Sequence, residues 1–392
     1  MRVVVFSHKP CWTSTSSPTG YATDGGFPFQ MRAISELFDA TTIVVPCSRG
    51  DRDGARRDGE ASLQGHQLTV LPTTPPMGSG LRRKLQFPVW LLRNSATIIR
   101  AIRNADAVHA PIPGDVGTIG MVLAVVLRKP LFVRHCGNWL RPRTTAEHFW
   151  RWFVERFAGG RNVMLATGGT AEAPSAINPN VRWIFSTTMS EAELQLGESR
   201  CAPPSAAARL IIVCRQDKAK GTDTVIDSLP LLMQGLPGIG LDVVGDGDHL
   251  EALRNRAASL GISDRVVFHG KQNHEAVLRL LRAAHLFVYP TRASEGFPKV
   301  VLEALACGLP VVTTRVSVLP QLLADGAGIL LDESVPAAVA RAVSDALSDP
   351  DRYRRMSASA IETARGFSLE RWRDTIGLAL RGAWGTPLRA HA

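Results

Sequence analysis

The sequence predicts an α/β protein with two Rossmann-like domains, each built on a parallel sheet. At 392 residues the chain is too long for one ordinary hydrophobic core, which favours two domains of about 200 residues each. Short β-rich runs alternate with helical segments along the whole chain, a pattern typical of βαβ units. A polar, proline-bearing break at residues 198–205 separates the two halves.

Apolar runs with the length and composition of strands occur in both halves. In the first half we expect strands at residues 3–7, 42–46, 68–71, 107–110, 131–135, 163–166 and 183–185. In the second half we expect strands at residues 209–213, 241–244, 266–268, 286–289, 311–313 and 329–331. The tail from residue 367 has a helical pattern. The predicted division is therefore 1–200, 201–366 and a C-terminal helix at 367–392.

Composition favours a globular, cytoplasmic protein. Hydrophobic residues make up 45% and charged residues 20%, which is the balance of a folded soluble chain. The six cysteines are scattered without metal-ligand spacing, so we expect reduced thiols. The apolar run at residues 1–6 is too short for a signal peptide, and the run at 116–127 is too short for a membrane helix.

The net charge of +10 indicates an anionic partner. Two segments mix basic and bulky apolar residues: 81–93, followed by Arg100 and Arg103, and 148–153, followed by Arg156. They are either amphipathic helices packed on a sheet with a solvated basic face, or surfaces that bind anionic lipid. We expect a phosphate-bearing substrate, with peripheral contact at the inner face of the membrane as a second possibility, rather than nucleic acid.

Residues 286–308 predict an anion-binding site. A strand ends at Tyr289, a loop follows, and a helix begins near Pro298 and ends at Gly308, because proline is tolerated at a first helical position and glycine ends helices. Free N–H groups and the positive end of the helix dipole together attract a diphosphate. The residues expected to form this seat are Gly296, Phe297, Pro298, Lys299 and Val300.

Two carboxylates flank this seat. Glu295 lies in the loop, and Glu303 lies about five residues into the helix, roughly 7 Å along its axis. A nucleoside diphosphate-sugar carries its sugar on one side of the phosphates and its ribose on the other. Each carboxylate is therefore suited to accept hydrogen bonds from hydroxyl groups of one of these parts.

Residues 294–312 resemble the E-x7-E motif of the retaining GT-B glycosyltransferases of family GT4. The likeness includes the Gly-Phe-Pro insert at 296–298, the Glu-Ala-Leu-Ala-Cys-Gly helix end at 303–308 and the Pro-Val-Val strand at 310–312. It implies a GT-B fold, in which an N-terminal acceptor domain and a C-terminal donor domain face each other across a cleft and the last helix crosses back to the first domain. It also implies that Glu295 contacts the donor sugar and Glu303 the ribose.

Two cations follow the strand at 209–213. Arg215 and Lys220 match the Arg and Lys-Gly positions of the family, and fixed cations stabilise a departing diphosphate more than its ground state. Lys218 is expected to be exposed. Gly245 opens a Gly-Asp-Gly turn that lacks the third glycine of a dinucleotide fingerprint, which argues against NAD. Lys271 occupies the position where relatives contact the nucleotide base.

The first half contributes a glycine pair and a histidine. Gly25 and Gly26 match a family loop that touches donor phosphate or acceptor, and the segment 10–23 before them is expected to be mobile. His135, at the end of a predicted strand, matches the family histidine that contacts the donor sugar. Arg134 and Asn138 are weaker candidates, and His109 is either on the acceptor side or structural.

The resemblance implies transfer of a hexose from a UDP- or GDP-sugar, with retention, to a hydroxyl of a glycan or lipid-linked acceptor in cell-surface polysaccharide or glycolipid biosynthesis. His135, Glu295, Arg215 and Lys220 are the expected catalytic residues. Because no D-x-D metal motif is evident in a suitable turn, we expect neither a metal nor a cofactor. Two alternatives are a nucleotide-sugar epimerase and a transferase with a soluble small-molecule acceptor. A third, of another class, is a non-catalytic membrane-surface module that binds sugar nucleotides, and release of free nucleotide diphosphate distinguishes an enzyme from it.

Overall fold

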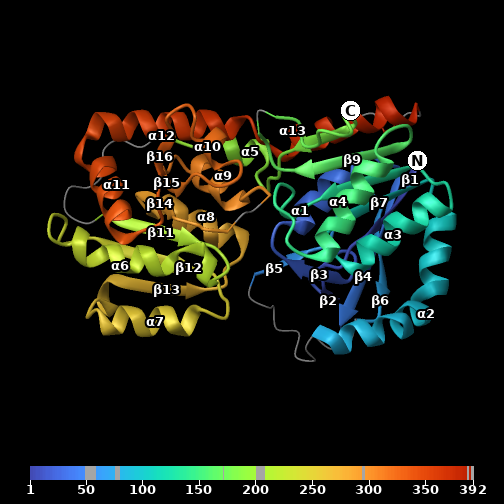
Figure 1. Cartoon of the computed structure of the whole chain (residues 1–392), viewed down its shortest axis with the longest axis horizontal. Coiled ribbons are helices and arrows are strands. Elements are labelled where there is room, and N and C mark those ends of the chain that lie inside the picture. Colours follow the sequence, from blue (N-terminus) through green and yellow to red (C-terminus); the bar gives the residue numbers. More distant parts are fainter. Residues whose placement is uncertain are drawn as a thin grey trace. The chain divides into compact units, whose positions relative to one another are not determined.

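The computed structural model describes residues 1–48, 59–75, 80–170, 172–199, 208–293, 296–385 and 388–389, with the side chains of 80–85 left out. The chain divides into two compact units (Figure 1). Unit 1 comprises Met1–Phe185 together with Leu369–Ala392, and unit 2 comprises Ser186–Ser368. The predicted α/β class with parallel sheets is confirmed.

The main sheet of unit 1 is parallel, in the order β10-β9-β8-β7-β1-β4, with β6 also paired to β4. Its order reverses between β1 and β7, so later strands are added on both sides of that point. The strands are β1 (Arg2–Phe6), β4 (Ala40–Ser48), β6 (Leu68–Thr73), β7 (Ala107–Ile112), β8 (Leu131–His135), β9 (Asn162–Thr167) and β10 (Val181–Ile184).

Both faces of this sheet are covered, as expected for parallel strands. Alternate side chains of β1 enter different cores: Val3 and Val5 join one cluster, and Val4 and Phe6 join the other. The first cluster includes residues of α1 and α13, and the second includes residues of α2, α3 and α4. These helices are α1 (Phe27–Ser35), α2 (Gly80–Asn104), α3 (Asp115–Val126), α4 (Thr145–Phe157) and α13 (Leu369–Trp384).

Three short strands that the sequence did not predict extend the sheet beyond β4. They are β2 (Cys11–Thr13), β3 (Tyr21–Asp24) and β5 (Glu60–Ser62). β2 and β3 form an antiparallel hairpin, and β3 also pairs with β5. The buried Trp12 indole donates to Glu60 Oε2 at 2.9 Å, which ties the hairpin to β5. Residues 11–13 and 21–23 of the segment expected to be mobile therefore lie in strands.

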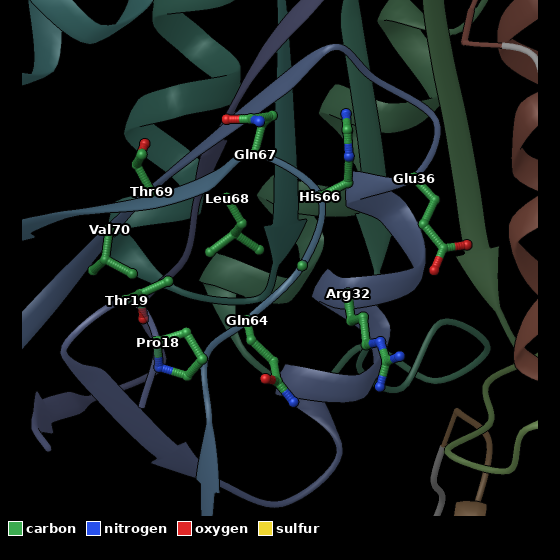
Figure 2. A pocket seen from close by; sticks show the side chains of 11 residues that line it. Pro18, Thr19, Arg32, Glu36, Gln64, His66, Gln67, Leu68, Thr69 and Val70 are labelled. Carbon is green, nitrogen blue, oxygen red and sulfur yellow. The ribbon is translucent and has the colours of Figure 1, made fainter. Parts of the chain in front are cut away.

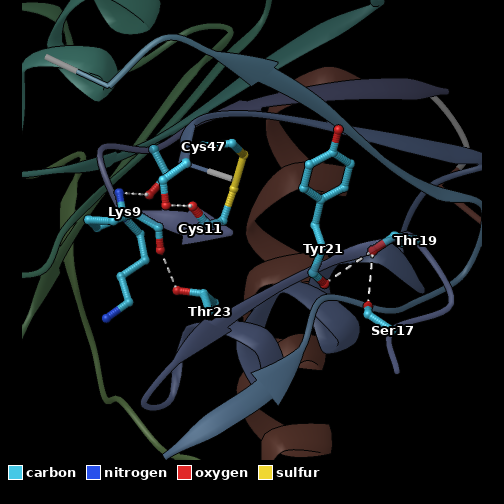
Figure 3. Close-up of a disulfide and its surroundings, with 10 residues drawn as sticks. Lys9, Cys11, Ser17, Thr19, Tyr21, Thr23 and Cys47 are labelled. Atoms are coloured by element: carbon cyan, nitrogen blue, oxygen red, sulfur yellow. Dashed lines mark hydrogen bonds between the residues drawn. A yellow bond between two sulfur atoms is a disulfide. The ribbon is translucent and has the colours of Figure 1, made fainter. Parts of the chain in front are cut away.

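A disulfide joins Cys11 to Cys47 (Figure 3). The two residues lie directly opposite each other in the parallel pairing of β2 with β4, with a Cα–Cα distance of 4.6 Å. The prediction that all six cysteines are reduced thiols is thus wrong for this pair. No local pattern marks the bond, because the two residues are 36 positions apart and β2 was not predicted.

The sheet of unit 2 is parallel throughout, in the order β13-β12-β11-β14-β15-β16. It is the strand order 3-2-1-4-5-6 of a Rossmann fold, and it reverses between β11 and β14. The strands are β11 (Arg209–Val213), β12 (Gly240–Val244), β13 (Val266–Gly270), β14 (Leu286–Tyr289), β15 (Val311–Thr314) and β16 (Gly328–Leu331). Each overlaps a strand predicted from the sequence.

Helices connect the strands of unit 2 and bury their apolar faces. α6 packs against α11, and α9 packs against α12. The α-helices are α5 (Glu191–Gln195), α6 (Thr222–Leu232), α7 (Leu250–Ser259), α8 (His274–Ala283), α9 (Lys299–Ala306), α10 (Leu319–Leu322), α11 (Pro336–Ser348) and α12 (Pro350–Arg365). Two short 3-10 turns are η1 (Lys218–Lys220) and η2 (Ser263–Arg265).

The first boundary between the units falls after Phe185, whereas the sequence placed it at residue 200. The difference has a local cause, because residues 186–197 follow β10 but contact unit 2. Thr188 and Glu193 bond to side chains of α9 and α8, and a Cβ on Gly197 would lie 2.5 Å from the carbonyl oxygen of Ala306.

The last helix, α13, belongs to unit 1 although it follows unit 2 in the chain. Its buried Trp372, Ile376 and Leu380 join the same core cluster as Val3 and Val5 of β1. No helix in the described ranges is both long and apolar enough to cross a membrane.

Candidate functional site

Two loops of unit 2 begin where its strand order reverses. One follows β11 and contains η1, and the other follows β14 and leads into α9. In open α/β sheets, ligands bind beyond the carboxyl ends of the strands at such a switch point. The predicted cations belong to the first loop, and the predicted anion seat belongs to the second.

Lys220 lies at the contact between these loops. Its Nζ donates to Tyr289 Oη at 3.3 Å and is 5.9 Å from the centroid of that ring. Burial lowers the pKa of Lys220, and the charge of Arg215 acts in the same direction. The next residue, Gly221, has φ +80, and a Cβ on it would lie 2.5 Å from the Pro290 carbonyl oxygen. Glycine is therefore required at residue 221 by the backbone conformation and the close contact, independently of the predicted phosphate role of Lys220.

Hydrogen bonds hold the two loops together. The backbone N–H of Arg292 donates to the Ala219 carbonyl at 2.8 Å, and its guanidinium Nη2 donates to the Lys218 carbonyl at 2.8 Å. The same guanidinium forms an ion pair with Asp223 at 3.3 Å. The backbone just before Lys220 is thus fixed to the loop after β14. Lys218 itself has an exposed side chain, as predicted.

Gln216 organises the loops after β11 and β12. The residue is fully buried, and its Nε2 donates to the carbonyls of Cys214 at 3.1 Å and Val244 at 3.0 Å, while its Oε1 accepts from Thr222 Oγ1 at 2.7 Å. Gly245 has φ +115, and a Cβ there would lie 1.9 Å from the Cys214 carbonyl oxygen. Gly245 is therefore required for close packing. Gln216 was not predicted as a site residue, although it lies in the same post-strand loop as Arg215 and Lys220.

Arg215 lies on the surface of the loop. Its side chain is 78% exposed, and its Nε and Nη2 donate to Asp217 Oδ2 at 3.2 and 3.1 Å. An exposed pair of this kind exchanges readily with solvent and contributes little to stability. Arg215 is accessible to an anion, but it must leave Asp217 to bind one with the same nitrogens.

Glu303, the fifth residue of α9, is buried at 8% exposure. Its Oε1 accepts a hydrogen bond from Thr188 Oγ1 at 2.5 Å and lies 3.4 Å from His274 Nδ1. The other ring nitrogen of His274 lies 3.2 Å from Glu193 Oε1. Side chains of α5, α8, α9 and the segment after β10 therefore form one polar cluster. The sequence did not predict the contributions of Thr188, Glu193 or His274.

Charge balance keeps this cluster ionised. Burial acts to raise the pKa of Glu303, but the hydrogen bonds and charge of His274 and the Thr188 hydroxyl outweigh it and lower that pKa. Burial acts to lower the pKa of His274, and the two carboxylates raise it to about 9. The pKa of Glu193 falls to about 2 despite burial, because His274 and Ser190 donate to its carboxylate.

The N-terminus of α9 begins at Lys299, with Pro298 as the N-cap residue. Among the described residues no side chain caps the helix. The Phe297 ring packs against Phe367 at 5.8 Å, and the Gly296 carbonyl accepts from Ser317 Oγ at 3.2 Å. Val300 completes the start of the first turn. Glu295 lies outside the described residues.

Lys271 follows β13 and is exposed at the end of that strand. Its neighbour His269 is half-buried, with Nε2 2.7 Å from Asp242 Oδ1. The base contact of Lys271 remains a prediction from the resemblance. The loops after β11, β12, β13 and β14 nevertheless all leave the same edge of the sheet, because parallel strands share their carboxyl ends.

In unit 1 the glycine pair precedes α1. Gly25 has φ +67, and Gly26 is the N-cap residue of α1, which begins at Phe27. Lys9 forms an ion pair with Asp24. The buried Thr23 Oγ1 donates to the Pro10 carbonyl at 2.6 Å, and Figure 3 shows the Thr23 side chain beside Lys9 and Cys11. The hairpin therefore fixes the approach to the glycine pair.

His135 ends β8 and is almost completely buried. Its ring lies edge-on to Trp139 with centroids 5.3 Å apart, and burial lowers its pKa to about 4. His135 is therefore neutral at pH 7, a form that can exchange hydrogen bonds with a sugar hydroxyl. Asn138, a weaker candidate in the following turn, bonds to Arg141: its Nδ2 donates to the carbonyl at 2.8 Å, and its Oδ1 accepts from the N–H at 3.2 Å.

Arg134 and His109 lie on the face of the unit 1 sheet that α1 and α13 cover. Arg134 is fully buried, donates to Gln30 Oε1 at 2.8 Å and lies 4.8 Å from the Trp372 ring centroid. His109 Nδ1 is 3.0 Å from the Phe132 carbonyl, and burial lowers its pKa to about 3. These contacts favour a structural role for His109, the second of the two interpretations that the sequence left open.

A separate surface cavity of about 830 Å³ lies on unit 1 (Figure 2). Its lining includes Arg32 and Glu36, at the end of α1, and residues 64–70 before and within β6. None of the predicted site residues lines it. Among the described residues, no group of three or more His, Cys, Asp or Glu side chains is arranged to hold a metal ion.

Residues 202–363 match the family described as Glycosyl transferases group 1. The chain is 28% identical over 318 residues to the GDP-mannose-dependent alpha-(1-6)-phosphatidylinositol monomannoside mannosyltransferase of Mycolicibacterium smegmatis, covering 74% of this chain and 80% of that enzyme. It is 37% identical over 164 residues to the D-inositol 3-phosphate glycosyltransferase of Nocardia farcinica, covering 40% of this chain but only 36% of that enzyme.

Solved structures share the fold over nearly the whole chain. Anabaena Alr3699/HepE in complex with UDP and glucose aligns with a TM-score of 0.70 at 18% identity, covering 97% of this chain and 100% of that one. WaaG, a glycosyltransferase involved in lipopolysaccharide biosynthesis, aligns with a TM-score of 0.66 at 16% identity, covering 97% and 100%. At these identities the likeness establishes the fold alone.

Proposed function

This chain belongs to the group 1 glycosyltransferases of GT-B fold, and from that premise we propose that it transfers a hexose from a UDP- or GDP-sugar to an acceptor hydroxyl with retention of configuration. The observation that carries the proposal is the convergence of Lys220 and the α9 N-terminus on one switch point of the unit 2 sheet. A cation and a helix N-terminus together suit a diphosphate.

The donor side of the proposal assigns a part of the nucleotide-sugar to each group. The diphosphate binds the N–H groups at the start of α9, with Lys220 and Arg215 as counter-charges. The ribose binds Glu303, and the sugar binds Glu295. The remaining groups lie at the edges of the donor: Gly25 and Gly26 approach donor phosphate or acceptor, and Gly245 and Lys271 border the nucleotide.

The comparisons support both GDP and UDP as the nucleotide of the donor. The mycobacterial relative, which covers most of this chain, has a name that specifies GDP-mannose. HepE, which shares the fold, was crystallised with UDP. The donor screen described below therefore includes both nucleotides.

The proposed reaction is a same-face substitution that needs no metal ion and no cofactor. The acceptor oxygen bonds to the anomeric carbon while the bond from that carbon to the diphosphate breaks. The acceptor proton passes to an oxygen of the leaving diphosphate. Lys220 and Arg215 stabilise the charge that develops on the diphosphate. His135, neutral at pH 7, hydrogen-bonds the sugar.

The test is a donor screen followed by two variants. Purified protein is mixed with UDP- and GDP-hexoses, and unfolding temperature and release of free nucleoside diphosphate are recorded. With the active donor, Lys220→Ala and Glu303→Ala should each lower kcat/KM by at least about tenfold, a loss of roughly 1.4 kcal/mol of transition-state stabilisation.

The matched control is Lys218→Ala, which removes a lysine two residues away whose side chain is exposed. It should keep kcat/KM within about twofold of wild type, because surface substitutions have small effects. Wild-type rates in both Lys220→Ala and Glu303→Ala would refute the donor assignment. Binding of a nucleotide-sugar without any release of diphosphate would instead favour the non-catalytic binding module.

For the acceptor we propose a glycan or a lipid-linked intermediate of cell-surface polysaccharide or glycolipid biosynthesis, reached from the cytoplasmic side of the membrane. The support is a set of exposed apolar side chains on two helices that also carry exposed arginines. Val89 and Leu92 are exposed on α2, and Phe149 and Trp152 on α4. Residues 81–85 of the predicted basic patch lie outside the described side chains.

Co-sedimentation with anionic vesicles tests this membrane contact. Binding should be clear at low salt and weaken as salt is added, because arginine contacts with lipid headgroups are screened. Trp152→Ser should weaken binding, whereas Ile177→Ser, which removes an exposed apolar side chain outside both helices, should not. Absence of binding at low salt would leave a soluble acceptor as the better proposal.

A further inference from the structure

We propose that His274 is a positioning residue, which holds one oxygen of Glu303 so that the other is presented to the ribose hydroxyls of the donor. This inference rests on the proposed function, because it needs a nucleotide at Glu303. His274 itself is not proposed to touch the nucleotide. Its effect is exerted through Glu303.

The geometry directs both protein contacts to one carboxylate oxygen. Thr188 Oγ1 donates to Glu303 Oε1 at 2.5 Å, and His274 Nδ1 lies 3.4 Å from the same atom. Within the described part of the chain, Oε2 receives no hydrogen bond. A carboxylate fixed in this way has the lone pairs of one oxygen available, and a ribose offers two neighbouring hydroxyl donors.

His274 is itself held from the other side. Its Nε2 lies 3.2 Å from Glu193 Oε1, so its ring lies between two carboxylates. His274 and Glu193 each lie in the first turn of a capped helix. Asn273 caps α8 by accepting from the Ala276 N–H at 2.8 Å, and Glu193 forms a capping box with Ser190 at the start of α5. The ring therefore has little freedom to turn away from Glu303.

The charges in the cluster favour the same arrangement. Among the described residues, the carboxylates of Glu193 and Glu303 face the imidazole, and the charge of Lys299 also acts on Glu303. A carboxylate buried without a cation would protonate and lose an acceptor. With His274 protonated, Glu303 stays ionised and can accept from both ribose hydroxyls. Charge-assisted hydrogen bonds of this kind are stronger than neutral ones.

The experiment compares nucleotides with and without the ribose hydroxyls. Calorimetry measures Kd for UDP and GDP and for their 2′,3′-dideoxy counterparts with wild type, His274→Phe and His274→Gln. Phenylalanine keeps a planar ring and removes both nitrogens, whereas glutamine retains one donor. His274→Phe should weaken binding of the ribonucleotide about tenfold, because Glu303 is no longer held in position to accept from the ribose. Tenfold corresponds to the loss of one charged hydrogen bond, that between Glu303 and a ribose hydroxyl. Binding of the dideoxynucleotide should change less than about twofold.

The Kd of His274→Gln for the ribonucleotide should lie between those of wild type and His274→Phe. A change in side-chain volume alone does not predict this order. His148→Phe on the exposed face of α4 is the matched control and should bind both nucleotides as wild type does. If His274→Phe does not fold, Glu193→Gln replaces it. That variant weakens the hold on His274 without touching Glu303, and should show a smaller loss confined to the ribonucleotide.

Two results overturn the inference while leaving the proposed function intact. One is equal weakening of ribo- and dideoxynucleotide in the His274 and Glu193 variants, which identifies a general structural role. The other is unchanged binding in those variants while Glu303→Ala weakens the ribonucleotide selectively. If wild type binds neither UDP nor GDP, the proposed function fails and the inference fails with it.

Discussion

The pKa values of two buried histidines, one near the predicted site of each unit, are shifted in opposite directions. In unit 1, His135 Nδ1 is buried and has no hydrogen-bond partner among the described residues, and its pKa falls to about 4. In unit 2, His274 lies between Glu193 and Glu303, and its pKa rises to about 9. Burial acts in the same direction on both. The difference shows that the neighbouring carboxylates, rather than depth alone, decide which histidine is charged.

The same contrast extends to the surrounding polar side chains. Arg134 Nε and His109 Nε2 in unit 1 are buried without partners in the described part of the chain. In unit 2, Gln216 satisfies its amide with two carbonyls and a threonine hydroxyl. Buried polar groups that are fully bonded make a site rigid, whereas unbonded ones carry a desolvation cost. Removing members of the two sets should therefore have different consequences.

The largest effect is expected for His274→Phe. It leaves Glu193 and Glu303 without their shared cation, and removing one partner of a buried ion pair costs about 3 kcal/mol or more of unfolding free energy. Urea unfolding at pH 7 gives the value. His135→Phe is the matched change in unit 1 and should cost less than about 1.5 kcal/mol, because one of the two nitrogens that it removes, Nδ1, has no partner among the described residues. Equal losses in the two variants would break the comparison.

The pH dependence of stability should also have opposite signs. For His274 the folded pKa lies above the ordinary 6.5, so its contribution is full below pH 6.5 and is lost as pH rises through 9. For His135 the folded pKa lies below 6.5, so its contribution is full above pH 6.5 and is lost as pH falls through 4. Each contribution is about 3 kcal/mol.

Urea unfolding of wild type and variants from pH 4 to pH 9.5 checks this prediction. His274→Phe should flatten the alkaline limb of the stability curve, between pH 6.5 and 9. His135→Phe should make the acid limb shallower and leave the alkaline limb as it is in wild type. Parallel curves for wild type and either variant across its own limb would show that the assigned charge state is wrong.

The sequence predicted the sheets well because their signal is local. Runs of buried aliphatic residues mark strands such as β8 and β11, whose bounds agree with the prediction. Helix α9 was equally visible, because proline and glycine mark its ends. Contacts between distant parts of the chain could not be predicted. Thr188 lies 115 positions from Glu303, and Glu193 lies 81 positions from His274.

The missed strands have the same explanation. β2, β3 and β5 are three or four residues each, and they pair with one another or with β4 beside the Cys11–Cys47 disulfide. No period can be recognised over so short a run. The expected boundary at residue 200 and the division after Phe185 differ for a related reason, since polar and proline residues at 198–205 indicate a break but not which unit the preceding helix joins.

A smaller effect is expected where the two loops of unit 2 touch. Gly221→Ala places a Cβ 2.5 Å from the Pro290 carbonyl oxygen at φ +80. Gly261→Ala is the matched control, because Gly261 has φ +68 and no atom lies within 4 Å of the methyl group that alanine would add. Both variants incur the cost of a left-handed alanine, about 1 kcal/mol. Gly221→Ala should be less stable than the control by about a further 1 kcal/mol, because its methyl group also displaces backbone.

Thermal unfolding of the two glycine variants measures the difference directly. Equal stabilities would mean that the backbone at Pro290 moves to accommodate the added methyl group. The contact between the two loops beside Lys220 would then be less rigid than the distances indicate. A loss in Gly221→Ala that is accompanied by weaker nucleotide binding, with Gly261→Ala unaffected in binding, would tie the rigidity of these loops to the proposed donor site.

The smallest effect is expected for Arg134→Met. The guanidinium donates to Gln30 and lies over Trp372, but among the described residues no carboxylate pairs with it. Methionine of similar length removes a desolvated charge and gives up one hydrogen bond and one cation–π contact, contributions of opposite sign and comparable size. The unfolding free energy should therefore stay within about 1 kcal/mol of wild type. A loss as large as that of His274→Phe would mean that the guanidinium is fully paired in solution, by ordered water or an anion, and would remove the contrast between the units.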